Sequence, residues 1–478
     1  MRNVDVIVLG CGPGGERTAI QAAKAGRSVV VVERAHVVGG NRVNWGTIPS
    51  KTLRESALFV HNLTRNKMDG IRVKIADEIT VADFMHRERT VVQRELELIS
   101  NSLARYQVEV VEGHGRFLDP HNVTVSDRNG AARETITGDV IVIATGSRPN
   151  RPADIPFDGE LVFDSESILH LPRMPRSMIV LGAGVIGIEY ASIFAALGIS
   201  VTLVDTRDRL LPYFDREIAG ILADALTRSG VVTTHGHRRA SVERIGGEPP
   251  HVRCSTDAGV ELEADVLLYC LGRNGNTDDI GLENIDLEAN DRGLLEVNKH
   301  CQTTNPHIYA VGDVIGYPSL ASTSMEQGRR AIRHALGIPG PNLADNELPF
   351  AIYSIPEVSY IGATEEALIE RGVAYVSGRG DYNKNPRGQI LGTRVGMLKL
   401  LFSTETLELL GAHIIGSGAS ELIHIAQAFL RTHATAVDIA ETLYNYPTLS
   451  DLYRHAAHVA LAEHHRVTGR RAWVGSET

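Results

Sequence analysis

Near its N-terminus the chain reads Asp5-Val-Ile-Val-Leu-Gly10-Cys-Gly12-Pro-Gly-Gly15, and it continues to Val29-Val-Val-Val-Glu33. The chain repeats it as Met178-Ile-Val-Leu-Gly182-Ala-Gly184-Val-Ile-Gly187, followed by Val201-Thr-Leu-Val-Asp205. In both copies an apolar run leads into Gly-x-Gly-x-x-Gly, and an acidic residue lies 23 positions after the first glycine (10 to 33, 182 to 205). Each copy therefore predicts a strand, a helix and a second strand in one buried unit.

The glycines of this pattern serve separate purposes. One makes a tight turn, one lets the backbone approach a pyrophosphate, and one lets the helix pack closely on the strand. The phosphates then lie at the helix N-terminus, where free N–H groups and the helix dipole favour anions. We expect the first helix to begin near Pro13 and to end at Gly26, where a left-handed C-cap carries little strain. Two dinucleotide sites on one chain indicate electron transfer between a bound cofactor and one that exchanges with solvent.

The composition is typical of a globular protein, and the length predicts roughly two to four domains. The 478 residues exceed a single ordinary core, and 48 basic against 58 acidic residues give a net charge of −10. That charge argues against nucleic acid or an anionic membrane as a partner. The four cysteines lack Cys-x-x-Cys spacing, so they are interpreted as structural thiols, and no metal site is predicted.

Neither the N-terminal apolar run nor the longest internal apolar run predicts a signal peptide or a membrane-spanning helix. The N-terminal apolar run contains Asp5 and leads directly into the glycine motif, unlike a signal peptide. The run from Met178 to Val204 holds four glycines and Glu189, and is interpreted as a buried βαβ unit. A cytoplasmic location is the expectation.

The remaining sequence divides into recognisable segments. We expect a polar helical region over 50–106, short strands over 108–125 with turns at Gly113, Gly115 and 119–120, and a strand over 139–146. A proline-rich linker follows Ser147. The second βαβ unit starts near 177, and another strand precedes Gly312-Asp313. From about 348 the pattern predicts antiparallel strands, including 397–402 and 409–415, and then helix from Ala419.

Two dinucleotide motifs, joined by Ala144-Thr-Gly and Val311-Gly-Asp, resemble the two-dinucleotide flavoprotein reductases, the family of glutathione reductase and lipoamide dehydrogenase. The resemblance covers the whole chain in order. It implies an α/β fold with two Rossmann-like dinucleotide-binding domains and an α+β C-terminal dimerisation domain. The implied boundaries are 1–150 and 273–346 for the FAD-binding domain, 151–272 for the NAD(P)-binding domain, and 347–478 for the dimerisation domain.

The same resemblance implies which residues would bind each nucleotide. Asp313 would bind the ribityl chain of FAD, and Ala321 would lie near the pyrimidine end of the flavin. The implied FAD set is Gly10, Gly12, Gly15, Glu33, Arg34, Gly115, Thr145, Gly146, Gly312, Asp313 and Ala321. The implied NAD(P) set is Gly182, Gly184, Gly187, Asp205, Arg207 and Gly272.

One segment departs from the disulfide reductases, which carry two redox cysteines in Gly-Gly-Thr-Cys-Leu-Asn-Val-Gly-Cys-Ile-Pro-Ser-Lys. Here it reads Gly39-Gly-Asn-Arg42-Val-Asn-Trp-Gly-Thr47-Ile-Pro-Ser-Lys51, so the cysteines fall on Arg42 and Thr47. Neither side chain can form a thiolate or a disulfide, so dithiol exchange is excluded at this place.

A second position agrees. The family's C-terminal base is a His before Pro-Thr, whereas this chain reads Asn445-Tyr446-Pro447-Thr448. A tyrosine hydroxyl is a poor base at neutral pH, so the base is missing together with the thiols.

Trp-Gly-Thr-Ile-Pro-Ser-Lys and Asn-Tyr-Pro-Thr resemble one branch of the family, the soluble pyridine nucleotide transhydrogenases. Members usually keep a cysteine where this chain has Arg42. The Arg42 guanidinium would either lie near the flavin and stabilise its anionic reduced form, or be a surface group tied to a helix end. Lys51 and Glu189 match the family's flavin-neighbouring pair, in which the cation stabilises developing negative charge and Glu189 orients it. An ordinary ion pair between helices is the alternative.

Nucleotide choice rests on the loop after the second acidic residue. Asp205 favours a free ribose 2′-hydroxyl and hence NAD(H). Arg207 and Arg209 either cradle a 2′-phosphate or are solvated loop charges. An acid beside arginines would suit one site that admits both NAD(H) and NADP(H).

The resemblance thus implies an FAD-dependent, Si-specific NAD(P)+ transhydrogenase, a homodimer or larger homo-oligomer. Hydride would pass reversibly between NADPH and NAD+ through the flavin, by a ping-pong mechanism without a redox disulfide. One alternative is an NAD(P)H dehydrogenase (diaphorase) that reduces quinone or oxygen. Another is a catalytically idle flavoprotein that serves as an assembly partner, and a lipoamide- or glutathione-type reductase is a third.

Overall fold

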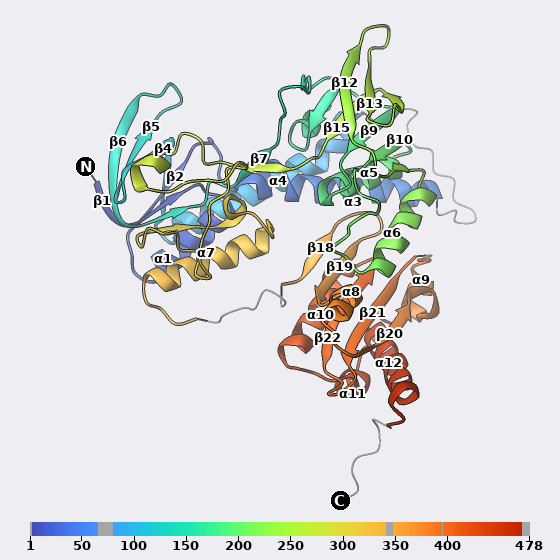
Figure 1. The fold of residues 1–478 in the computed structure, drawn as a ribbon. Helices are drawn as coiled ribbons and strands as arrows, with labels where there is room; N and C mark the ends of the chain where they lie inside the picture. The colour runs from blue at the N-terminus through green and yellow to red at the C-terminus, as the bar shows by residue number, and fades with distance from the viewer. Residues whose placement is uncertain (1, 66–79, 341–347, 394, 471–478) are drawn as a thin grey trace, which may run out of the picture. The chain divides into compact units, whose positions relative to one another are not determined.

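The computed structural model describes residues 2–65, 80–340, 348–393 and 395–470. The chain forms two compact units, each assembled from separate segments (Figure 1). The first unit comprises 1–56, 74–174 and 270–341. The second unit comprises 57–73, 175–269 and 342–478. The predicted boundary at 346/347 lies outside the described residues, and the four-segment division of the chain stays a prediction.

A seven-stranded sheet forms the centre of the first unit, in the order β3-β2-β1-β6-β5-β4, with β17 also paired to β6. The strands β3, β2, β1, β6 and β17 run parallel, and β4 and β5 extend the sheet as an antiparallel hairpin. The strands are β1 (Arg2–Leu9), β2 (Val29–Glu33), β3 (Glu109–Glu112), β4 (His114–Asp119), β5 (Asn122–Ser126), β6 (Ala132–Ile143) and β17 (Ile308–Ala310). A separate two-stranded ribbon pairs β7 (Ser147–Pro149) with β16 (Arg273–Gly275), and β8 spans Val162–Asp164.

Both faces of this sheet are covered, which explains the continuous apolar runs of the first motif. Along β1, Val6 and Val8 pack into a cluster with helix residues, while Ile7 and Leu9 pack into a cluster on the other face. The helices of this unit are α1 (Pro13–Lys24), α2 (Gly40–Asn44), α4 (Val81–Arg105) and α7 (Ala321–Ala335), and α1 packs against α7. Of α3 (Thr47–Arg65), residues 47–56 belong to this unit. The predicted first helix is confirmed: it begins at Pro13, and Gly26 follows its C-cap with φ +75°.

The predicted turn at Gly115 is wrong. Gly115 lies inside β4, paired with Val125 of β5. A Cβ atom at Gly115 would lie 2.8 Å from Leu9 Cδ2, so the glycine permits close packing on β1 rather than a change of direction.

The second motif lies in the second unit and forms the same arrangement. Its parallel strands follow the order β11-β10-β9-β15, and a three-stranded antiparallel sheet follows the order β12-β13-β14. The elements are β9 (Ser177–Leu181), α5 (Val185–Ala196), β10 (Ser200–Val204), α6 (Arg216–Arg228), β11 (Val232–Thr234), β12 (Arg239–Ile245), β13 (His251–Thr256), β14 (Glu261–Ala264) and β15 (Val266–Tyr269).

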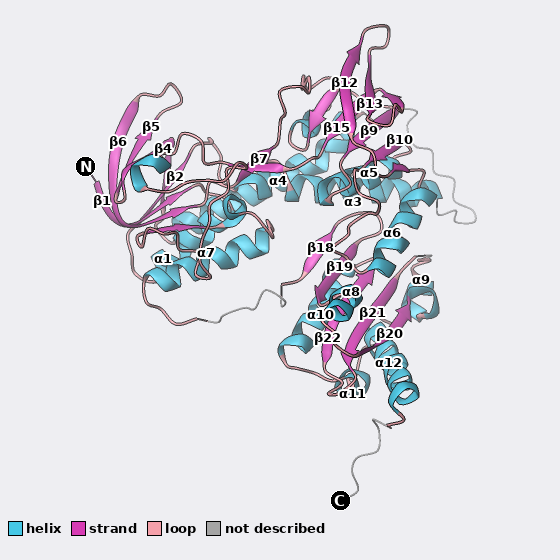
Figure 2. Cartoon of the chain, viewed as in Figure 1, coloured by secondary structure: helices cyan, strands magenta, loops and turns pink. Residues whose placement is uncertain are grey.

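The C-terminal part of the second unit is a five-stranded antiparallel sheet with helices around it (Figure 2). The strand order is β18-β19-β22-β21-β20; α10 packs on β19 and β22, and α12 on β20 and β21. The elements are β18 (Phe350–Ile352), β19 (Val358–Gly362), α8 (Glu365–Glu370), β20 (Tyr375–Asp381), α9 (Pro386–Ile390), β21 (Met397–Ser403), β22 (Leu409–Ile415), α10 (Ala419–Arg431), α11 (Ala436–Glu441) and α12 (Leu452–Thr468). The predicted antiparallel strands and the helix from Ala419 are confirmed.

Candidate functional site: two dinucleotide motifs and a cavity

The loop of the first motif has the geometry that its glycines predict. Gly10 has φ +103°, and a Cβ atom at Gly15 would lie 1.9 Å from the Gly10 carbonyl oxygen, so neither position admits a side chain without displacement. Gly12 is the N-cap of α1, and a Cβ there would meet only Gly40 Cα, at 3.9 Å. The backbone before α1 is therefore open to a ligand, beside the unpaired N–H groups of the first helical turn.

The second motif repeats this geometry. Gly182 has φ +102°, and a Cβ at Gly187 would lie 1.8 Å from the Gly182 carbonyl oxygen. Gly184 is the N-cap of α5, and a Cβ there would meet no atom within 4 Å. The two loops therefore differ little in backbone form.

Each acidic residue accepts the same two backbone hydrogen bonds. Glu33 Oε2 accepts from the Cys11 N–H at 2.7 Å, and Oε1 from the Ala35 N–H at 2.9 Å. Asp205 Oδ2 accepts from the Ala183 N–H at 3.0 Å, and Oδ1 from the Arg207 N–H at 3.0 Å. Both carboxylates are buried and anchored to the glycine loop of their own motif.

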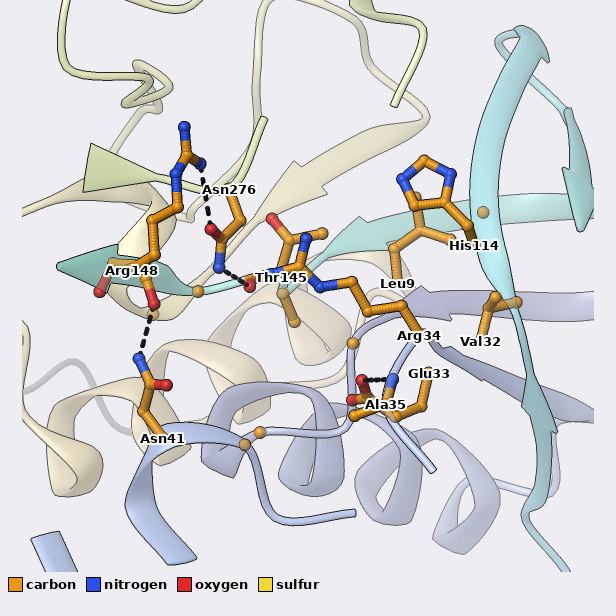
Figure 3. A pocket seen from close by; sticks show the side chains of 18 of the residues that line it. Leu9, Val32, Glu33, Arg34, Ala35, Asn41, His114, Thr145, Arg148 and Asn276 are labelled. Atoms are coloured by element: carbon orange, nitrogen blue, oxygen red, sulfur yellow. Dashed lines mark hydrogen bonds between the residues drawn. The ribbon is translucent and has the colours of Figure 1, made fainter. Parts of the chain in front are cut away.

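A cavity of about 1220 Å³ adjoins the first motif, large enough for an extended dinucleotide (Figure 3). Of the predicted FAD set, Gly15 alone is not in its wall, since it packs against Gly10. The predicted residues that line it are Gly10, Gly12, Glu33, Arg34, Gly115, Thr145, Gly146, Gly312, Asp313 and Ala321. Thr145 Oγ1 is buried, with no hydrogen-bond partner among the described residues, so a donor and acceptor remain available there.

The cavity wall is fixed by polar residues that sequence reasoning did not single out. Asn41 Nδ2 donates to the Ser147 carbonyl at 2.7 Å, and Asn276 Nδ2 donates to the Thr145 carbonyl at 2.9 Å (Figure 3). Ser147 Oγ donates to Asp313 Oδ2 at 2.7 Å. The sequence offered one signal, the stretch Arg273-Asn-Gly-Asn276-Thr that follows the exit strand of the second motif.

His114 lies across the view of Figure 3 from Asn41 and Arg148, on the side of Arg34. Burial and the positive charge of Arg34 lower the pKa of the His114 imidazole. The imidazole is therefore neutral at pH 7 and can accept a hydrogen bond at this end of the cavity.

Arg42 is not a surface residue. Its side chain is 11% exposed, lines the cavity, and donates from Nη2 to Glu16 Oε2 at 3.0 Å. Glu16, 2% exposed, lies in the first turn of α1, so Arg42 is bound to a helix end, as one of the two predicted alternatives states, but in the interior and not at the surface. The sequence does not predict this ion pair, because Glu16 looks like an ordinary acidic residue in the first turn of a helix. Arg42 Nε is buried, with no partner among the described residues.

The four cysteines, all within the described ranges, are free thiols. Burial, with the charges of Glu33 and Glu16, raises the pKa of Cys11 to about 12, and burial raises that of Cys301 to about 11. Neither is a nucleophile at neutral pH.

Lys51 and Glu189 belong to different units, so their pairing stays a prediction. Glu189 is buried on α5, where its Oε1 accepts the Tyr353 N–H at 2.9 Å. Nearby, Ser192 Oγ accepts the Ile355 N–H at 3.1 Å. The segment after β18 thus holds the helix that carries Glu189.

In the second motif the Arg207 side chain lies on Asp205. Nε donates to Oδ1 at 3.0 Å, and Nη2 donates to Oδ2 at 2.6 Å. Burial opposes ionisation of Asp205, but the hydrogen bonds from Arg207 outweigh it and lower the pKa of the carboxyl. Arg209 Nη2 instead donates to the Pro212 carbonyl at 2.6 Å. Gly272 lies in the first unit, and its role beside this motif stays a prediction.

Three carboxylates in the second unit, Asp215, Glu217 and Glu365, lie close enough together to suggest a cation site. The Lys399 ammonium already lies among them, 2.9 Å from Asp215 Oδ2, 2.9 Å from Glu217 Oε2 and 2.5 Å from Glu365 Oε2. The cluster is therefore an ion-pair network.

Within the described ranges, no helix is long and apolar enough to cross a membrane.

Known proteins show which family and which relatives this chain resembles. Residues 4–328 match the family model described as pyridine nucleotide-disulphide oxidoreductase, and 348–457 match the dimerisation domain of the same family. The chain is 46% identical over 457 residues to a protein of Mycobacterium tuberculosis named soluble pyridine nucleotide transhydrogenase, covering 96% of this chain and 97% of that one. It is 42% identical over 460 residues to the protein of that name from Chromohalobacter salexigens, covering 96% and 98%.

Solved structures agree with the fold. LpdA from Mycobacterium tuberculosis superposes with a TM-score of 0.89 at 27% identity, covering 96% of this chain and 99% of that one. The HOCl-induced flavoprotein disulfide reductase RclA from Escherichia coli gives a TM-score of 0.83 at 26% identity, covering 95% and 99%. The predicted fold class, two Rossmann-like domains with an α+β dimerisation domain, is confirmed.

Proposed function

The chain belongs to the pyridine nucleotide-disulphide oxidoreductase family, and from that premise we propose that it is an FAD-dependent, Si-specific NAD(P)+ transhydrogenase. One observation carries the proposal: both dinucleotide motifs are intact, while Arg42 and Thr47 occupy the positions of the family's thiol pair. Electrons that enter from a nicotinamide nucleotide then have no dithiol to reach, and a second nicotinamide nucleotide is the acceptor. The names of the relatives support the same activity.

The residues of the first unit fit FAD. The α1 N-terminus would bind its diphosphate, Glu33 a ribose, and Asp313 the ribityl chain. Thr145 Oγ1, buried without a partner among the described residues, supplies a hydrogen-bonding group that the ligand would satisfy. When bound, FAD supplies the two-electron chemistry that accepts and returns a hydride.

The second motif would bind NADPH and NAD+ in turn, which makes the mechanism ping-pong. NADP+ would leave before NAD+ enters, because both would bind at the same motif, from Gly182 to Asp205. Hydride transfer moves no proton at the nicotinamide carbon, so the missing His-Pro base is not needed; Tyr446 at that position is 73% exposed. Proximity and stacking supply most of the rate.

Lys51 would place its ammonium beside the flavin edge and stabilise negative charge there, with Glu189 as its orienting partner. The backbone N–H of Tyr353 would keep Glu189 in place. The 347–478 segment would form a homodimer, and we retain the cytoplasm as the proposed location and nicotinamide dinucleotides as the partners.

A stopped-flow experiment tests the proposal. The oxidised holoenzyme is reduced anaerobically with NADPH and then mixed with NAD+; we expect flavin reoxidation and stoichiometric NADH within the turnover time. Absence of NADH excludes a transhydrogenase. Reoxidation by quinone or oxygen alone identifies a diaphorase, and no reduction by either nucleotide identifies an idle flavoprotein. Stereospecifically deuterated NADPH checks the Si assignment.

A further inference from the structure

The two acidic residues that end the two motifs differ in one respect. Glu33 and Asp205 accept matching backbone hydrogen bonds, from Cys11 and Ala35 and from Ala183 and Arg207 respectively. The residue two positions after Glu33 is an alanine, whereas the residue two positions after Asp205 is an arginine whose guanidinium adds two further bonds.

These bonds occupy the acceptor sites of the Asp205 carboxylate. An ionised carboxylate offers about four lone-pair sites. Oδ1 accepts from the Arg207 N–H and Nε, and Oδ2 accepts from the Ala183 N–H and Arg207 Nη2, at 2.6–3.0 Å. A ribose hydroxyl can therefore bind Asp205 only where the guanidinium yields a site. Glu33 accepts two backbone bonds and keeps capacity for a ribose.

Arg207 keeps capacity on its other edge. A guanidinium has about five N–H donors, of which Nε and one Nη2 hydrogen are directed to Asp205. The side chain is 37% exposed while Asp205 is 2% exposed, so its outer edge faces solvent. That edge has the planar fork that matches a phosphate.

We propose that Arg207 is the residue that lets one pocket accept both nucleotides, by acting as an adapter on Asp205. With NADP(H), Arg207 stays on Asp205, cancels its charge, and binds the 2′-phosphate through its outer N–H groups. With NAD(H), Arg207 moves off and leaves Asp205 to accept the ribose 2′-hydroxyl. This inference rests on the proposed function and names the specificity device of its second site.

Arg209 takes no part in this device. Its Nη2 donates to the Pro212 carbonyl at 2.6 Å, which turns that guanidinium back onto its own loop. The chain therefore offers a matched control: Arg207→Ala and Arg209→Ala each remove one cation from the same loop, two residues apart.

The test uses holoenzyme, whose flavin site is filled, and calorimetric titration with two probes that lack nicotinamide. Adenosine 2′,5′-bisphosphate carries the 2′-phosphate, and adenosine 5′-monophosphate carries the free hydroxyl. For Arg207→Ala we expect binding of the bisphosphate to weaken by at least about tenfold, since a charge-assisted fork is lost and Asp205 is unmasked. Binding of the monophosphate stays equal or tightens. Arg207→Lys, which keeps the charge without the fork, falls between.

For Arg209→Ala we expect both affinities within about twofold of the parent, because Nη2 of that side chain is bonded to the Pro212 carbonyl of its own loop and not to Asp205. The proposal is overturned if Arg207→Ala weakens the binding of both probes equally. It is also overturned if the tenfold loss of bisphosphate binding appears in Arg209→Ala instead. Neither probe carries a hydride, so the titration does not depend on hydride transfer. A protein that binds the two probes as expected but forms no NADH in the stopped-flow experiment supports the role of Arg207 and contradicts only the transhydrogenase proposal.

Discussion

Asp205 directly follows β10, its carboxylate accepts four hydrogen bonds, and its removal is expected to affect the two nucleotides differently. Asp205→Ala is expected to weaken NADH binding by about tenfold, since the 2′-hydroxyl loses a charged acceptor, while NADPH binding changes less because Arg207 remains. Titration of the holoenzyme with each nucleotide measures both effects. Asp208→Ala, an exposed acid in the same loop, is the control and leaves both affinities unchanged. If Asp205→Ala weakens the binding of NADH and of NADPH equally, Asp205 does not determine nucleotide specificity.

Arg42 and Glu16 form a buried pair in the wall of the cavity, and breaking it leaves a buried charge. Arg42→Met is expected to destabilise the protein toward the lower end of about 3–5 kcal/mol, since Arg17 Nη2, 3.5 Å from Glu16 Oε1, offsets part of the loss. Denaturant unfolding of the holoenzyme measures it. Arg42→Met combined with Glu16→Gln restores most of the stability; a double variant as unstable as the single one contradicts the pairing.

At the scale of elements, the strand–loop–helix units are held by contacts that only glycine permits. Gly187→Ala should lower thermal stability and abolish nucleotide binding at the second site. The added Cβ would lie 1.8 Å from the Gly182 carbonyl, and the gain of about 1 kcal/mol in helix propensity cannot offset that clash. Thermal unfolding and NADH titration report the two effects.

Gly184→Ala is the matched control in the same loop. A Cβ there meets nothing within 4 Å, and its φ of −77° suits any residue. This variant should unfold near the parental temperature but bind NADH more weakly, because the methyl group would occupy the space in which we propose that the pyrophosphate binds. Similar unfolding temperatures for Gly184→Ala and Gly187→Ala would show that the loop tolerates both.

At the scale of the molecule, ion pairs join distant segments of the second unit. Lys399 of β21, with 0% exposure, contacts Asp215 at the N-cap of α6 and Glu365 of α8. Glu217 also contacts Arg379. Burial opposes ionisation of Glu217, but Arg379 and Lys399 outweigh it and lower its pKa to about 2. The network therefore contributes most when all three carboxylates are ionised.

This sets the direction of an acid effect. Glu217 has a lower pKa in the folded chain than in the unfolded one, so it contributes stability above about pH 4.5 that is lost as the pH falls toward about 2. Glu217→Gln should be less stable than the parent at pH 7, and its stability should fall less steeply over that window. Denaturant unfolding from pH 7 to pH 3 measures both slopes; parallel slopes contradict the assignment.

The two βαβ units, the family resemblance and the absence of cysteines at 42 and 47 could be predicted from the sequence. Glycine spacing, apolar runs and the residues at 42 and 47 are local properties that need no knowledge of distant contacts. The same reasoning failed at Gly115, because a glycine that admits Leu9 and one that makes a turn look alike in sequence.

The contacts of the charged residues could not be predicted from the sequence and depend on the folded chain. Arg42 pairs with Glu16, 26 positions away (16 to 42), and its burial depends on how the fold brings α2 to the N-terminus of α1. In the loop after β10 the sequence left two arginines equal, and the fold directs Arg207 to Asp205 and Arg209 to Pro212. Hydrogen-bond partners and burial depend on atoms that the folded chain brings within about 3 Å, and residue type alone does not specify them.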